Sequence, residues 1–112
     1  MSNLLNSIIL EGVISSVDTG KCDTKGNLNS GFVLSVERTY KNASGKDITE
    51  KSDFEVRAAG AAIAGSIQRW AKANGEVRVV GRLKEEKFSV DGKKCSKIIV
   101  IAEHIEYKRI PQ

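Results

Sequence analysis

Strand-like segments fill most of this chain, and only one stretch has the spacing of a helix. Alternating apolar and β-branched residues predict strands at 6–17, 32–41, 48–59, 77–88 and 96–107. Between the third and fourth strands the period becomes helical over residues 61–75, with an apolar stripe at Ile63, Ile67, Trp70 and Ala71. Asn74-Gly75 supplies a stop signal for this helix. We expect the stripe, including Trp70, to pack against the sheet.

Five long strands in a chain of 112 residues require a strongly curled sheet. A five-stranded barrel with a helix after its third strand is the OB arrangement. The sequence contains no internal repeat and no low-complexity stretch that would mark a boundary. We therefore predict an all-β fold with one helix, a five-stranded OB-fold barrel in the order β-β-β-α-β-β, forming a single domain over residues 1–112.

Turn-forming residues separate the predicted strands. Residues 18–31 contain three glycines and are predicted to be a loop. Residues 42–47 form a second connection, in which Gly45 supplies the turn. Asp91-Gly92 lies within residues 89–95 and is a strong signal for a tight hairpin between the last two strands.

The fourth predicted strand, "VRVVGRLKEEKF", has two chemically different faces. Val77, Val79 and Leu83 fall on one face, which can pack on a core. The other face carries the charged residues Arg78, Arg82, Lys84 and Glu86 and ends in Phe88. An aromatic ring at the end of a charged face either caps the barrel or is covered by a ligand.

The residues do not assemble a catalytic or metal site. The single histidine, His104, lies in a strand, and the chain has no glycine-rich phosphate loop and no nucleophile elbow. Cys22 and Cys95 are not in CxxC spacing and cannot complete a zinc site with one histidine, so they are expected to be free thiols. We therefore expect neither enzymatic activity nor a cofactor.

Composition and the termini favour a cytoplasmic protein, and a nucleoid-associated one if the partner is DNA. The sequence has no apolar run long enough to span a membrane, and its N-terminus lacks the features of a signal peptide. The net charge of +4 and the pI of about 9.2 suit a polyanionic partner. Because 14 acidic residues dilute this charge, the charge alone does not identify nucleic acid.

Aromatic residues interleaved with cations are the strongest functional signal. Unstacked bases need flat rings, and phosphates need positive charge. Candidate DNA-binding residues of both kinds fall on strands two, three and four and on the last hairpin: Arg38, Tyr40, Lys41, Phe54, Arg57, Arg82, Lys84, Lys87, Phe88, Lys93 and Lys94. The alternatives remain open at this point. Tyr40 can be an isolated surface residue, Phe54 can belong to the core, and the lysines of the hairpin tip can be merely solvated.

The sequence resembles bacterial-type single-stranded DNA-binding proteins. The resemblance extends from residue 6 to about residue 107 and rests on "NSIILEGVI", "GFVLSVERTY" and "ASGKDITEKSDFEVRAAGAAIAG". Its most specific part is "NGEVRVVGRLKEEKF" followed by "DGKK". The family has an OB fold and binds single-stranded DNA without strong sequence preference. It usually assembles as a homotetramer.

The resemblance also implies roles for individual residues. Tyr40, Phe54 and Phe88 match three stacking aromatics of the family, whereas Ala59 stands where a fourth is expected. Arg82, Lys84 and Lys87 match its basic stretch. The segment 6–12 matches the strand that pairs subunits, which would give an exposed edge strand a partner.

Three departures from the family pattern stand out. "SSVDTGKCDTKG" replaces an acidic-proline motif, and the segment 54–60 is one residue short, which leaves the register of the third strand open. The sequence ends at "YKRIPQ", without the linker and acidic tip that recruit replication and repair enzymes in the family. It is therefore expected to be a tail-less form, either truncated or of phage, plasmid or divergent origin.

The main hypothesis is single-stranded DNA binding with little sequence preference, in replication, recombination or repair. The expected partners are single-stranded DNA and further copies of the chain, as a tetramer or a dimer. The alternative hypothesis is an OB module of the primosomal type, which binds proteins and has only secondary affinity for DNA. An RNA-binding role is a third hypothesis. Nothing in these residues clearly reads the 2′-hydroxyl group, so the choice of DNA over RNA rests on the resemblance alone.

Overall fold

The computed structural model describes residues 4–22 and 28–109, and its strands close a barrel in the order β1-β2-β3-β5-β4. The elements in chain order are β1 (Ile8–Cys22), β2 (Leu28–Lys41), β3 (Asp47–Ala58), α1 (Ala61–Trp70), β4 (Glu76–Val90) and β5 (Lys93–Arg109). The predicted order of three strands, one helix and two strands is confirmed, as is the five-stranded barrel. In the described part of the chain, no helix is long and apolar enough to cross a membrane.

Apolar residues from the five strands and the helix fill the barrel. Its core contains Ile14, Phe32, Leu34, Val56, Ile67, Val77, Val79, Val100, Ala102 and Ile105. β4 crosses β5 so closely at Gly81 that a Cβ atom there would lie 1.9 Å from the Ile101 carbonyl oxygen. Only a residue without a side chain allows this contact between the two strands.

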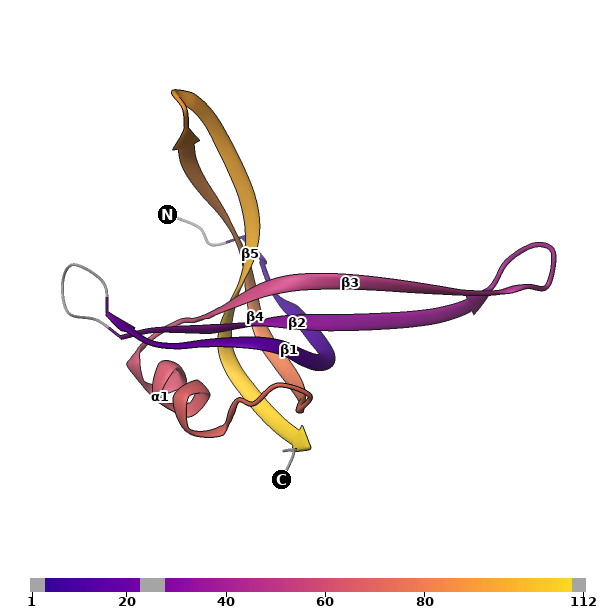
Figure 1. Cartoon of the computed structure of the whole chain (residues 1–112), viewed down its shortest axis with the longest axis horizontal. Coiled ribbons are helices and arrows are strands. Elements are labelled where there is room, and N and C mark those ends of the chain that lie inside the picture. The colour runs from indigo at the N-terminus through magenta and orange to yellow at the C-terminus, as the bar shows by residue number, and fades with distance from the viewer. Residues whose placement is uncertain (1–3, 23–27, 110–112) are drawn as a thin grey trace.

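Two hairpins extend beyond the barrel as arms and point in different directions (Figure 1). The β2–β3 arm comprises residues 36–52, and its pairing continues to Lys41 and Asp47. The β4–β5 arm comprises residues 84–98, and its pairing continues to Val90 and Lys93. Asp91 and Gly92 join its strands with φ of 51° and 79°. Positive φ at both positions is the geometry of a tight hairpin turn, as Asp91-Gly92 predicts.

The helix is shorter than predicted. It ends at Trp70, because Ala71 is extended with φ −73° and ψ 126°. The segment that follows is held by β1: Asn74 donates its backbone N–H to the Ile14 carbonyl at 2.8 Å, and Ile14 donates to the Gly75 carbonyl at 2.8 Å. This pairing with a strand is incompatible with a helix that continues to residue 75.

Trp70 does not pack against the barrel as predicted. Its side chain is 48% exposed, whereas the neighbouring Ala71 is buried. The inward positions of the helix are taken by Ala64 and Ile67. The helix ends at Trp70, so Ala71, the last residue of the predicted apolar stripe, lies just beyond it.

The predicted loop at residues 18–31 is largely strand. β1 continues to Cys22 and β2 begins at Leu28, and these two residues are paired. The register shifts between Ile14 and Ser16 and again between Asp18 and Lys21. Such irregularities let a glycine- and asparagine-rich segment remain paired while the strand bends. The remainder of the predicted loop, 23–27, lies outside the described residues.

Candidate nucleic-acid interface

Three aromatic rings predicted to stack on bases are all partly open to solvent. Tyr40 is 38% exposed, Phe54 36% and Phe88 40%. Tyr40 lies near the end of the β2–β3 arm and Phe54 near its root, whereas Phe88 lies on the β4–β5 arm. Each ring belongs to a strand that leaves the barrel, so the core does not bury it completely.

Arg38, Tyr40 and Phe54 lie on one face of the β2–β3 arm. Phe54 pairs with Leu34, and cross-strand partners project on the same side of a sheet. Leu34, Val36, Arg38 and Tyr40 follow one another at every second position of β2 and therefore share that side. The Arg38 guanidinium carbon lies 5.7 Å from the centroid of the Tyr40 ring, within range of a cation–π interaction. Lys41, next in the chain, is exposed.

This register settles the position of the third strand. Phe54 shares the side of Val56, which is fully buried, but its ring lies at the end of the barrel where the arm begins. It is therefore partly a core residue and partly a surface residue. Phe54 pairs with Leu34, which lies six positions before Tyr40 on β2. Phe54 and Tyr40 are therefore about 20 Å apart along the strand.

Phe88 is the centre of an aromatic and cationic cluster on the β4–β5 arm. It pairs across the hairpin with Cys95, a free thiol. The Lys97 ammonium lies 6.0 Å from the centroid of its ring. Phe88, Lys94 and Cys95 line a shallow cavity of about 640 Å³. Lys93 and Lys94 are exposed at the tip of the same arm.

A second group of cations lies at the root of the β4–β5 arm. Arg57 of β3 pairs with Ile101 of β5, which pairs in turn with Arg82 of β4. Lys84 follows on the same face of β4 and is paired with Ile99. Arg57, Lys84, Ile99, Ile101 and Val33 line a groove of about 640 Å³. This groove combines an apolar floor with two cationic residues.

Arg57 is not free within this groove. Its guanidinium makes ion pairs with Glu86 of β4 and, at 2.6 Å, with Glu55 of β3. The hydrogen bond to Glu86 is the main reason why the pKa of Arg57 is raised. The same bond holds the pKa of the Glu86 carboxyl below its usual value, so that Glu86 is charged at neutral pH.

Lys97 extends the network, because its ammonium lies 3.2 Å from Glu55 and 3.8 Å from Glu86. Glu55 and Glu86 were not among the predicted site residues. The alternation of β4 places Glu86 between Lys84 and Phe88 on one face, and this was the available signal.

Lys87 is one of several predicted site residues that the structure does not place on the face of Phe88. It alternates with Glu86 and Phe88 and therefore projects from the opposite face of the arm. Its ammonium lies 3.7 Å from Glu85 on that face. The structure thus brings Arg57, Arg82, Lys84 and Phe88 to one face of the sheet. Lys87 and Lys94, which pairs with Ser89, project from the opposite face of the arm, and Phe54 lies on the other side of β3 from Arg57.

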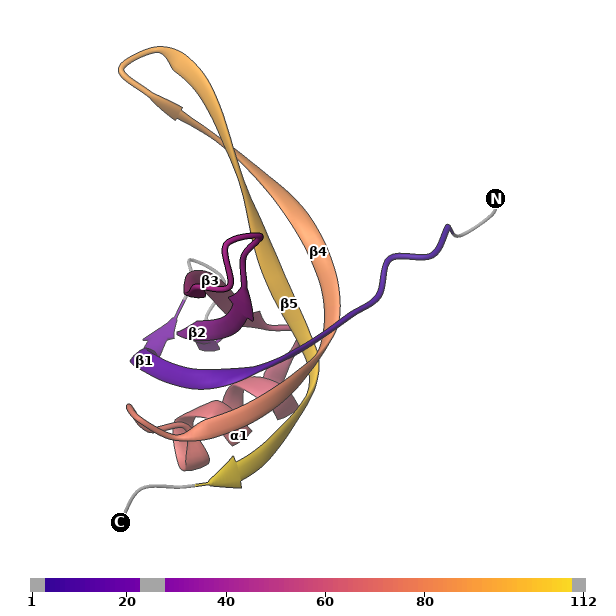
Figure 2. The same cartoon turned by 90° about the vertical axis from the view of Figure 1, so that its right-hand side faces the viewer.

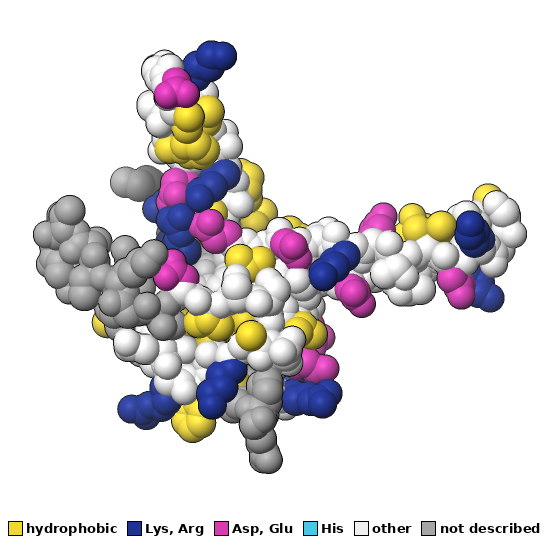
Figure 3. Space-filling model, in the orientation of Figure 1, with side chains coloured by type: hydrophobic (Ala, Val, Ile, Leu, Met, Phe, Trp, Pro, Cys, Tyr) yellow, Lys and Arg dark blue, Asp and Glu magenta, His cyan; other side chains and the backbone are white. Residues whose placement is uncertain are grey.

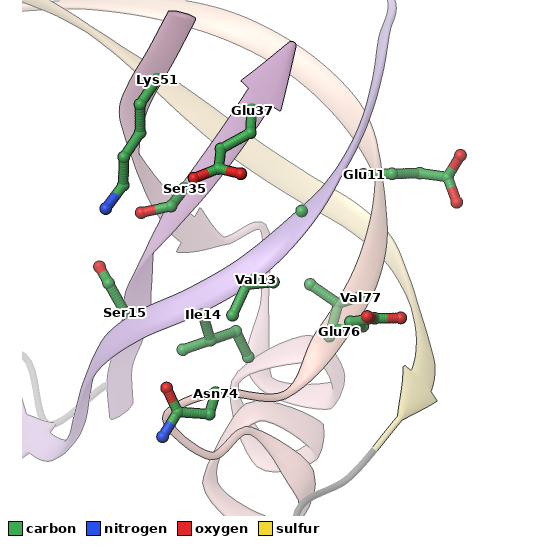
Figure 4. A pocket seen from close by; sticks show the side chains of 11 residues that line it. Glu11, Val13, Ile14, Ser15, Ser35, Glu37, Lys51, Asn74, Glu76 and Val77 are labelled. Carbon is green, nitrogen blue, oxygen red and sulfur yellow. The ribbon is translucent and has the colours of Figure 1, made fainter. Parts of the chain in front are cut away.

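A further cavity of about 570 Å³ lies beside β1 and is lined by none of the predicted site residues. Glu37 and Lys51 extend toward it from β2 and β3, and Glu76 lies across from them (Figure 4). Carboxylates on two sides make this cavity unfavourable for a phosphate. In the part of the chain that the structure describes, no group of His, Cys, Asp and Glu residues could hold a metal ion.

Comparisons with known proteins give a consistent family resemblance. No family model matches the chain. The chain is 37% identical over 81 residues to the single-stranded DNA-binding protein of Aquifex aeolicus. The aligned region covers 72% of this chain and 54% of the relative. It is 25% identical over 103 residues to the single-stranded DNA-binding protein of Fusobacterium nucleatum, which covers 92% of this chain and 66% of that relative. The chain thus spans between half and two thirds of the length of these relatives.

Solved structures agree on the fold. A complex of the Plasmodium falciparum SSB with single-stranded DNA aligns with a TM-score of 0.81 at 17% identity, covering 97% of this chain and 93% of the other. A deletion mutant of the single-stranded DNA-binding protein from Thermus aquaticus aligns with a TM-score of 0.74 at 24% identity, covering 92% of this chain and 50% of the other.

The resemblance predicted from the sequence is therefore confirmed by both kinds of comparison. The chain is an OB-fold domain similar in sequence to the bacterial single-stranded DNA-binding proteins and similar in fold to the solved structures of such proteins.

Proposed function

We propose that this protein binds single-stranded DNA with little sequence preference, in replication, recombination or repair. The observation that carries the proposal is the exposure of Tyr40, Phe54 and Phe88, each open to solvent by more than a third and each on a strand that also bears cations. Exposed rings beside cations suit unstacked bases and their phosphates. The similarity to proteins named for this activity supports the same conclusion.

The binding mechanism follows from the two kinds of residue. Arg82 and Lys84, with Lys93 and Lys94 at the tip, attract the phosphates of the strand. Bases then stack on Phe88 and on the rings of the β2–β3 arm, and such stacking tolerates any base because every base has a π face. Lys41 adds charge near Tyr40, and Lys87 attracts phosphates from the opposite face of the arm. The protein acts by binding and not by catalysis.

We further propose that the protein works as a homo-oligomer joined through residues 6–12. This segment has β4 on one edge from Ile8 onward, whereas pairing with β2 begins only at Val13. Leu4, Leu5 and Ile9 are 90%, 94% and 66% exposed. The chain that precedes β1 leads away from the barrel (Figure 2). An open strand edge next to exposed apolar residues suits pairing with a second copy. A tetramer is the expected assembly, and a dimer is the alternative.

The proposed place of action is the cytoplasm, at the nucleoid. Single-stranded DNA that is exposed during replication or repair would be the ligand there. Replication and repair proteins are further candidate partners.

Fluorescence anisotropy of labelled oligo-dT, titrated at two salt concentrations, tests the DNA-binding proposal. We expect tight binding that weakens with salt. The logarithm of the binding constant should fall against the logarithm of the salt concentration with a slope of about 0.7 for each phosphate neutralised. Duplex DNA should compete poorly, and oligo-U used as a competitor separates DNA from RNA preference. Weak binding to all three ligands would contradict the proposal and favour an OB module that binds proteins. Analytical ultracentrifugation of the same protein tests the oligomer.

A further inference from the structure

Four charged side chains form a closed network where the β4–β5 arm meets β3. Arg57 pairs with Glu55 and Glu86, and Lys97 pairs with the same two carboxylates. Between 29% and 42% of each side chain is exposed, so the network lies at the surface. Acidic and basic side chains are interleaved at the root of this arm (Figure 3). The two positive and two negative charges of the network cancel.

The network lies between the two parts of the proposed DNA-binding face. On one side is the groove with Lys84, Ile99 and Ile101, of which Arg57 and Glu55 are themselves lining residues. On the other side is Phe88, whose ring lies 6.0 Å from the Lys97 ammonium. A DNA strand that runs from the groove to Phe88 therefore passes over these four residues. The inference that follows rests on the proposed function.

We propose that Glu55 and Glu86 act as built-in competitors of the DNA phosphates for Arg57 and Lys97. A carboxylate and a phosphate bind a guanidinium through the same N–H donors. Both terminal nitrogens of Arg57 already contact a carboxylate, one on each glutamate. A phosphate that binds Arg57 either displaces one of these carboxylates or binds the remaining N–H donors next to two negative charges, so the network lowers the affinity of this face for DNA.

This role differs from a purely structural one in its salt dependence. The slope arises because each phosphate that a protein cation neutralises releases counterions from the DNA. A cation held by a glutamate neutralises no phosphate and adds nothing to the slope, whereas a cation that has lost its glutamate adds one phosphate contact. If the network only fixed the arm against β3, loss of a carboxylate would instead loosen the arm and weaken binding.

The test is the Glu86→Gln variant, which keeps the shape of the side chain and removes its charge. Labelled oligo-dT is titrated by anisotropy at several salt concentrations, with the thermal midpoint and elution volume of each protein measured alongside. We expect binding at low salt to tighten by about two- to fivefold, the range of an exposed ion pair. We also expect the logarithmic salt slope to steepen by about 0.7, the contribution of one phosphate contact. Glu55→Gln should act in the same direction.

Glu106→Gln is the matched control. It removes the same charge from a glutamate of β5 that is paired with an arginine of β4, Arg78. Arg78 and Glu86 are eight residues apart on β4, about 26 Å, which is more than twice the screening length at 0.1 M salt. We expect the affinity and salt slope of this variant to equal those of the parent.

The outcomes separate this inference from the proposed function. The inference is wrong if Glu86→Gln binds no more tightly than the parent at an unchanged thermal midpoint while the parent binds oligo-dT well. It is also wrong if Glu106→Gln tightens binding equally, because net charge would then explain the effect. If neither the parent nor Glu86→Gln binds oligo-dT, both the inference and the proposed function fail. If only Glu86→Gln binds, the competitor role is supported.

Discussion

The side chain of Asn6 continues the β1–β4 pairing by bonding to the backbone of Leu83. Its Nδ2 donates to the Leu83 carbonyl at 2.8 Å, and the Leu83 N–H donates to its Oδ1 at 3.0 Å. The last backbone pair before it is Ile8 with Gly81, so an amide side chain occupies the next ladder position. Asn6 thereby ties the N-terminal segment to the root of the β4–β5 arm.

Replacing Asn6 by alanine should free the backbone of Leu83. Two exposed hydrogen bonds are lost, and each contributes about 0.5–1.5 kcal/mol. We expect amide exchange at Leu83 to accelerate by about tenfold, while exchange in the barrel core at Val79 remains unchanged. Asn6→Asp, which keeps an acceptor for the Leu83 N–H, should restore most of the protection. Equal exchange at Leu83 in the parent and Asn6→Ala would contradict this role.

Gly81→Ala should destabilise the barrel strongly. The added Cβ would meet the Ile101 carbonyl oxygen at 1.9 Å, and a backbone atom cannot rotate away as a side chain can. We expect a loss of about 3 kcal/mol in the free energy of unfolding, at the upper end of the cost of overpacking. Urea unfolding followed by circular dichroism measures the change.

Gly65→Ala is the matched control for this substitution. Gly65 lies within α1, and a Cβ atom there would meet nothing within 4 Å. Alanine in a helix is favoured over glycine by about 0.5–1 kcal/mol, so this variant should gain stability. Similar losses in both variants would mean that the close contact of β4 with β5 does not constrain the fold.

Much of this fold was predictable from the period of the sequence alone. A strand period in five segments and a helical period in one gave the barrel and its order. Asp91-Gly92 gave the hairpin turn, because its chemistry requires no knowledge of distant residues. The end of the helix was missed, because it depends on Ile14, which is 60 residues from Asn74 in the chain and hydrogen-bonds its backbone.

The candidate site was predictable in its residue types but not in its pairings. Alternation within β4 places Glu86 and Phe88 on one face. The contact between Arg57 and Glu86 arises only because β3 pairs in parallel with β5, which carries β4 on its other edge. No local pattern encodes that neighbourhood, so the sequence shows Arg57 as a cation without indicating its two carboxylate partners.

Tyr107 should give the protein an alkaline limit to its stability. Burial raises the pKa of its hydroxyl, against a smaller lowering by the hydrogen bond with Ser66 at 2.8 Å. The folded state therefore holds this proton more tightly than the unfolded state. The stabilisation is fully present below the ordinary tyrosine pKa of about 10 and is lost as the pH rises through the raised value in the folded state.

Thermal midpoints measured between neutral pH and pH values above the tyrosine range test this dependence. The parent should lose stability at the alkaline end, and Tyr107→Phe, which has no proton to release there, should lose less. The two midpoint curves are expected to converge as the pH rises. Parallel curves over the whole range would show that burial of the Tyr107 hydroxyl does not control the alkaline limit.

Phe88→Ala should weaken the binding of oligo-dT without unfolding the protein. Loss of one stacked base costs about 1–3 kcal/mol, which corresponds to about five- to 150-fold in the dissociation constant. The ring is 40% exposed on an arm outside the barrel, so little core packing is lost with it.

Ile98→Ala is the matched control, because Ile98 is 61% exposed and pairs with Glu85 on the opposite face of the same arm. Anisotropy titrations at one salt concentration should show a large loss for Phe88→Ala and almost none for Ile98→Ala. Equal affinities in all three proteins, at equal thermal midpoints, would rule out stacking on Phe88 and shift the search for the DNA path to the β2–β3 arm.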